Sequence, residues 1–77
     1  MRTLYIMYTV KLTYPTERTQ TYKESITYCA SIDLYALHGI DCAQSSATTL
    51  VFDSDRDRVF ALLALSKYNY FSAVCVD

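Results

Sequence analysis

The sequence contains few of the residues that build flexible linkers, metal centres or disulfide frameworks. It has one glycine, one proline, one histidine and no tryptophan among 77 residues. So few glycines and prolines exclude a long linker or a low-complexity segment, and we expect residues 1–77 to form a single domain. The three cysteines are odd in number and form no CxxC pair. This argues against a disulfide framework and favours the reduced thiols of a cytoplasmic protein.

Charge and long apolar runs are also scarce. The net charge is -1, from seven basic and eight acidic residues. General nucleic-acid binding needs a basic face, so we expect no direct nucleic-acid partner. The longest uninterrupted apolar run covers only residues 59–65, too short to cross a bilayer, and no signal-peptide pattern opens the chain. Hydrophobic residues nevertheless reach 52%, eight tyrosines among them, which is ample for a folded core.

The stretch TLYIMYTVKLTY, residues 3–14, is the clearest strand. Its odd positions place Tyr5 and Met7 among threonines and a lysine. Strict alternation leaves one face of a strand at least partly open, so we expect Tyr5 and Met7 to project from an uncovered sheet face and to contact a partner. The even positions predict the core face: Leu4, Ile6, Tyr8, Val10, Leu12 and Tyr14.

Two helices and two further strands follow from pattern and capping. Residues 25–38 are predicted as a helix, with Ser25 as N-cap and Gly39 in the left-handed conformation that ends it. Residues 54–68 form the second helix, with Ser54 as N-cap. Residues 48–53 and 70–76 are strands. Residues 17–24 are ambiguous: we prefer a strand folding back as a hairpin over a helix starting near Thr16, because threonine is a poor helix former.

These elements predict an α+β domain, a single four-stranded sheet with two helices on one face. The preferred order is β-β-α-β-α-β. A ferredoxin-like β-α-β-β-α-β order is the close alternative, with an earlier start to the first helix and a short strand at residues 40–45.

The helix at 25–38 carries two apolar stripes, of which a domain this small can bury only one. We expect the core stripe to be Ile26, Cys29, Ala30 and Leu37. Tyr28, Ile32 and Tyr35 lie roughly opposite. Because tyrosine is enriched at interface hot spots, this second stripe is predicted to bind a partner.

Two short motifs suggest catalysis or metal binding at first sight. Cys42 follows His38 by four residues, but Gly39 breaks the helix between them, so a cysteine–histidine pair is not expected. The alternating Asp53, Asp55 and Asp57 resemble a calcium loop but lack its glycine and its closing glutamate. They are predicted to cap the second helix and to offer an acidic tip to arginine or lysine on a partner. The sequence therefore identifies no catalytic residue, metal ligand or cofactor, and we expect no enzyme.

In overall profile the chain resembles the small inhibitors that bacteriophages make against host machinery, the anti-CRISPR proteins above all. The shared features are the short chain, the α+β domain, the many tyrosines and the free cysteines. The resemblance transfers no site residue. It implies a stoichiometric binder that blocks a nucleoprotein complex, whose Arg- and Lys-lined surface would suit Asp53, Asp55 and Asp57. The alternatives are a homo-oligomeric structural or regulatory module, such as a homodimer, and a single-stranded nucleic-acid binder with an open aromatic sheet face.

Overall fold

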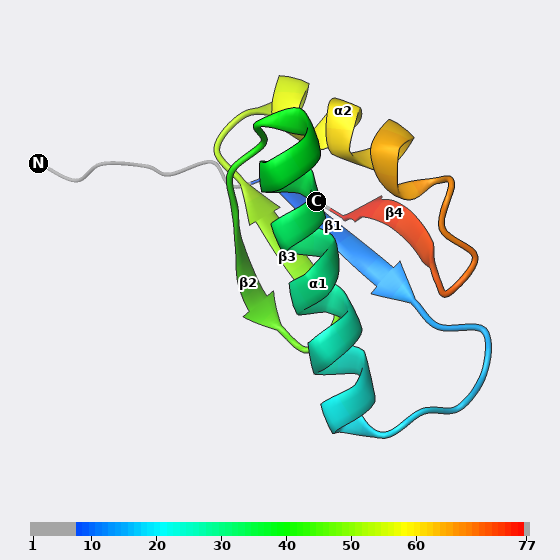
Figure 1. Ribbon diagram of the computed structural model, residues 1–77. Helices are drawn as coiled ribbons and strands as arrows, with labels where there is room; N and C mark the ends of the chain where they lie inside the picture. Colours follow the sequence, from blue (N-terminus) through cyan, green and yellow to red (C-terminus); the bar gives the residue numbers. More distant parts are fainter. Residues whose placement is uncertain (1–7, 77) are drawn as a thin grey trace, which may run out of the picture.

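The computed structural model describes residues 8–76, which form two helices and four strands in the order β-α-β-β-α-β. The strands make one antiparallel sheet in the order β2-β3-β1-β4, and both helices pack on the same face of it (Figure 1). The α+β class with a single four-stranded sheet is therefore confirmed. The elements are β1 (Tyr8–Thr13), α1 (Gln20–His38), β2 (Cys42–Ser46), β3 (Thr49–Phe52), α2 (Asp55–Leu65) and β4 (Ser72–Val76).

Of the two element orders, the ferredoxin-like alternative is the one observed, and the preferred hairpin over residues 17–24 is wrong. Helix α1 begins at Gln20 and not after Ser25. Its N-cap is Thr19, whose hydroxyl accepts a hydrogen bond from the Tyr22 N–H at 3.1 Å. Thr19 thus acts as a cap, the position that suits threonine best in a helix. The short strand that this alternative requires is β2.

Tertiary contacts from Tyr14, just after β1, explain why α1 starts so early. The Tyr14 hydroxyl lies 3.3 Å from the Lys23 carbonyl oxygen, to which it donates, and 3.1 Å from Thr27 Oγ1. Its ring meets that of Tyr22 edge-on, with centroids 6.2 Å apart. These contacts fix the first turns of α1 against the sheet, and packing of this kind overrides weak helix propensity.

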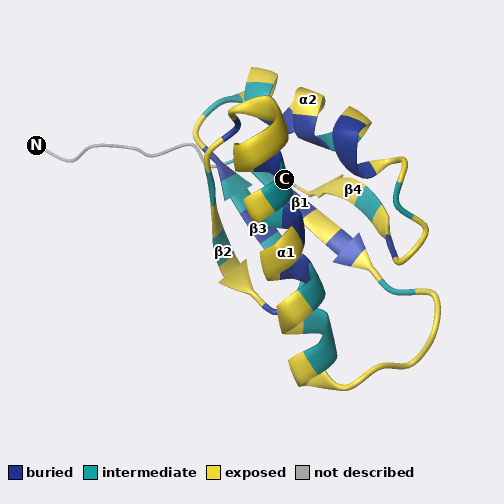
Figure 2. Ribbon diagram, viewed as in Figure 1, coloured by how far each residue is buried: buried dark blue, intermediate teal, exposed yellow. Residues whose placement is uncertain are grey.

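Strand β1 shows the predicted alternation. Val10 and Leu12 are buried, whereas Lys11 and Thr13 are exposed, so buried and exposed residues alternate along this strand (Figure 2). Leu4, Tyr5, Ile6 and Met7 lie outside the described residues. The core is formed by the inner face of the sheet and the two helices, chiefly through Val10, Leu12, Ala30, Leu34, Leu50, Phe52, Ala61 and Leu65.

The core-facing stripe of α1 matches the predicted one only in part: Ala30 is buried and Ile26 packs against the core. Its buried residues are Thr27, Ala30 and Leu34, whereas Cys29 and Leu37 are exposed. Thr27 is fully buried, and its hydroxyl is hydrogen-bonded to the Tyr14 hydroxyl, so its burial leaves no polar group unsatisfied. A pattern of apolar residues treats threonine as polar, so it does not predict that Thr27 belongs to the core-facing stripe of the helix.

Helix α1 ends at Gly39, as predicted. Gly39 has a φ of 67°, in the left-handed region, and its N–H donates to the Tyr35 carbonyl at 3.0 Å. The next N–H, that of Ile40, donates to the Leu34 carbonyl at 3.1 Å, and the Ile40 side chain is buried. This is an αL C-cap, with the 5→1 bond from Gly39 to Tyr35 and a further bond from Ile40 to Leu34. It turns the chain sharply from α1 into β2 and so sets these two elements side by side.

Candidate functional site

The predicted partner-binding stripe on α1 is exposed along the outer side of the helix. Tyr28 is 57% exposed, Ile32 47% and Tyr35 65%. Spacings of four and three residues bring them onto one side of the helix, away from the core. The exposed positions along the outer side of α1 are visible in Figure 2. Three large side chains, two of them aromatic, are thus available to a partner.

A shallow groove runs between this stripe and strand β2. Besides the three stripe residues, its lining consists of Ser31, Asp41, Cys42 and Gln44. The Gln44 side chain donates from Nε2 to the Glu24 carbonyl at 3.2 Å, which ties β2 to α1. The groove therefore has a wall of apolar and aromatic side chains on α1 and a more polar wall on β2.

Strand β2 is an edge strand. In the described sheet it pairs with β3 alone, and its ladder is interrupted by an irregularity between Gln44 and Ser46. Its sequence, CAQSS, contains no lysine and no proline, the residues that commonly block pairing at an edge. The ferredoxin-like alternative predicted a short strand at residues 40–45, which overlaps β2. We call Tyr28, Ile32, Tyr35 and the outer edge of β2 the α1–β2 surface.

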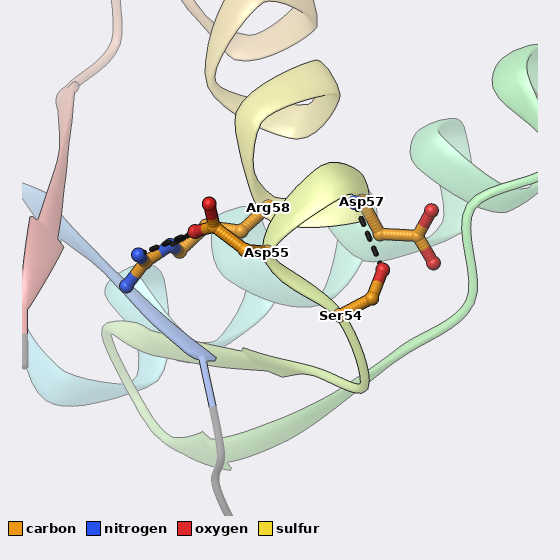
Figure 3. A network of polar contacts seen from close by, with 4 residues as sticks. All are labelled: Ser54, Asp55, Asp57 and Arg58. Atoms are coloured by element: carbon orange, nitrogen blue, oxygen red, sulfur yellow. Dashed lines mark hydrogen bonds and ion pairs between the residues drawn. The ribbon is translucent and has the colours of Figure 1, made fainter.

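The three aspartates predicted as an acidic tip lie in three different environments. The Asp55 carboxylate is 2.6 Å from the Arg58 guanidinium, whose central carbon lies 5.2 Å from the Tyr8 ring centroid. Asp57 is two residues further along the helix, and its carboxylate points away from Asp55 and Arg58 (Figure 3). Its backbone N–H donates to Ser54 Oγ at 3.1 Å, so the predicted N-cap is confirmed. Asp53 precedes the helix and is exposed.

The environment of Cys42 disfavours a nucleophilic thiol. Cys42 is half-buried, and burial raises its pKa to about 11, with the charge of Asp41 adding to the shift. Because the thiolate is the reactive form, little of the nucleophile is present near neutral pH. Among residues 8–76, no group of three histidine, cysteine or acidic side chains is placed to hold a metal ion.

We expect Cys42 to react with iodoacetamide about tenfold more slowly than an ordinary thiol at pH 7.5. Raising the pKa from 9.0 to about 11 lowers the thiolate fraction roughly a hundredfold, and the higher intrinsic nucleophilicity of a more basic thiolate recovers about tenfold. The measurement is the alkylation rate of the Cys29→Ser, Cys75→Ser double variant, read by intact mass. A free cysteine in a short unstructured peptide is the reference, and an equal or faster rate for Cys42 would contradict the expectation.

Searches of protein-family models, curated proteins and solved structures gave no match to this chain. In the part of the chain that the structure describes, neither helix is long and apolar enough to cross a membrane.

Proposed function

We propose that this protein is a non-enzymatic, cytoplasmic protein-binding module whose partner docks on the α1–β2 surface. The observation that carries the proposal is the exposure of Tyr28, Ile32 and Tyr35 beside an edge strand. Tyrosine supplies a large, rigid contact area with a polar tip, which suits an interface anchor. An edge strand adds backbone hydrogen bonds when it pairs with a strand of the partner.

The partner that we propose is a host nucleoprotein complex such as a CRISPR effector, which the protein would inhibit by occupying its surface. The resemblance in profile to phage inhibitors supports this choice. The exposed carboxylate of Asp53 would add charge complementarity to an Arg- and Lys-lined surface.

A homodimer is the second candidate, and the edge position of β2 favours it. Two copies related by a two-fold axis can pair the same edge strand with itself in an antiparallel manner, since an isologous interface uses the same patch twice. The open face of the sheet gives less support to a nucleic-acid binder. The side chains that the described strands place on that face, such as Thr9, Lys11, Val51 and Val74, include no aromatic ring.

Tyr35→Ala tests the proposed surface, with Tyr70→Ala as its matched control. Both tyrosines are more than half exposed, but Tyr70 lies in the loop before β4, away from the α1–β2 surface. Truncation of an interface anchor costs more than about 1 kcal/mol, so we expect Tyr35→Ala to weaken binding roughly fivefold or more and Tyr70→Ala to leave it unchanged.

The readouts are inhibition of DNA cleavage by purified CRISPR effectors and sedimentation equilibrium of the protein alone, which detects the dimer. A wild-type protein that inhibits no effector and stays monomeric at high micromolar concentration would overturn the proposal. Equal losses in the two variants would also count against the α1–β2 surface.

A further inference from the structure

A second surface, separate from the α1–β2 surface, lies between the C-terminal end of α1 and the outer side of α2. It is a cleft of about 610 Å³. Its lining shares no residue with the groove beside β2. The lining includes three basic side chains and three large apolar ones: His38, Arg56 and Lys67, and Ile40, Phe60 and Leu63.

The α2 side of the cleft has an ordered arrangement of apolar and basic residues. Arg56, Phe60, Leu63 and Lys67 follow one another at spacings of four, three and four, the repeat of a helix–helix seam. Phe60 and Leu63 are exposed although both are large and apolar. Lys67 lies two residues past the end of the helix, so the apolar centre has a cation before it and a cation after it.

The charge of the cleft is opposite to that of the whole chain, which carries -1. Arg56 and Lys67 form no ion pair among residues 8–76, and the Arg56 guanidinium lies 5.6 Å from the centroid of the Phe60 ring. Asp57 is the one acidic residue among the lining residues. Two permanent cations thus face one carboxylate, so the cleft favours a negatively charged ligand.

We propose that this cleft binds an acidic amphipathic helix of a partner protein. The apolar face of that helix would cover the exposed Phe60 and Leu63, as helices lie in apolar grooves elsewhere. Its carboxylates would pair with Arg56 and Lys67 in charge-assisted hydrogen bonds. Arg56 lies in the first turn of α2 and Lys67 lies just past its end, so the partner would carry a carboxylate at each end of its apolar face.

The probe for this proposal is a fluorescein-labelled 18-residue peptide with leucines on one helical face and glutamates at both ends of that face. A scrambled peptide of the same composition, in which the leucines share no face, is the control. Fluorescence anisotropy should show saturable binding of the first peptide only. We expect Arg56→Glu and Lys67→Glu each to weaken it about tenfold, and Leu63→Ala about fivefold. Arg56→Lys, which keeps the charge, should retain most of the binding.

The Ile32→Glu variant should bind the peptide as the parent does, because Ile32 lies outside the cleft. The two variants therefore test the two surfaces independently. Ile32→Glu should lose binding at the α1–β2 surface and keep peptide binding, whereas Leu63→Ala should lose peptide binding and keep binding at the α1–β2 surface. Equal binding of the scrambled peptide, or no saturation up to millimolar peptide, would overturn the proposal. Tighter binding of anionic vesicles or of a single-stranded oligonucleotide would assign the cleft to another ligand and would overturn it too. Circular dichroism checks that each variant is folded.

Discussion

Leu12→Ala is expected to lower the free energy of unfolding by about 2 to 5 kcal/mol, because Leu12 is only 1% exposed and fills the core beneath both helices. Strand β1 is central, between β3 and β4, so the cavity would lie in the middle of the sheet where neighbouring elements can collapse least. Domains of this size have a thin margin within the usual range of about 5 to 15 kcal/mol. The substitution should therefore leave a large fraction of the protein unfolded at 37 °C.

Urea denaturation followed by circular dichroism measures this cost, and Lys11→Ala is the matched control. Lys11 is the preceding residue of the same strand and points to the open face of the sheet, where it is exposed. Its truncation should change the stability by no more than about 0.5 kcal/mol. If the two variants lose similar stability, then the assignment of the buried and open faces of β1 is wrong.

Elements with a strong local signal could be predicted from the sequence. Alternation in β1 identified its buried face, and the Ser54 cap marked the start of α2. The first turns of α1 and the whole of β2 have no such signal. Residues 20–24 are helical because Tyr14 and Tyr22 pack together across a loop, which no window of sequence reveals. The strand CAQSS is held by pairing with β3 and by the Gln44 side chain.

The candidate sites also differ in whether a local sequence pattern predicts them. Tyr28, Ile32 and Tyr35 were predicted from helical spacing alone, and they are exposed together. The prediction that Asp53, Asp55 and Asp57 form one acidic tip considered their alternation in sequence but not the helix that contains two of them. Residues two apart on a helix point about 200° apart, so Asp55 and Asp57 face different neighbours once α2 forms. The cleft was missed because its two sides, at His38 and Lys67, come from elements far apart in the chain.

Ile32→Glu should weaken the binding free energy at the α1–β2 surface by about 2 kcal/mol or more, which is roughly a thirtyfold loss of affinity. Ile32 lies between Tyr28 and Tyr35 along the stripe, so a partner that contacts both tyrosines also covers it. A carboxylate at that position would be removed from water without a counter-charge, which costs far more than the lost methyl groups. The stability of the unbound protein should change little, because Ile32 is half exposed and glutamate is a good helix former.

Val59→Glu is the matched control, since Val59 is also a β-branched residue on an outer helix face and is 46% exposed against 47% for Ile32. Sedimentation equilibrium and the effector-cleavage assay should show loss of association for Ile32→Glu and parental behaviour for Val59→Glu. The two readouts distinguish the two kinds of partner: sedimentation equilibrium of the protein alone detects only a homodimer, and the cleavage assay detects binding to an effector. If Ile32→Glu leaves both dimerisation and inhibition unchanged while remaining folded, the stripe has no role in binding, and its exposure reflects only that α1 has more apolar residues than one face of a small core can cover.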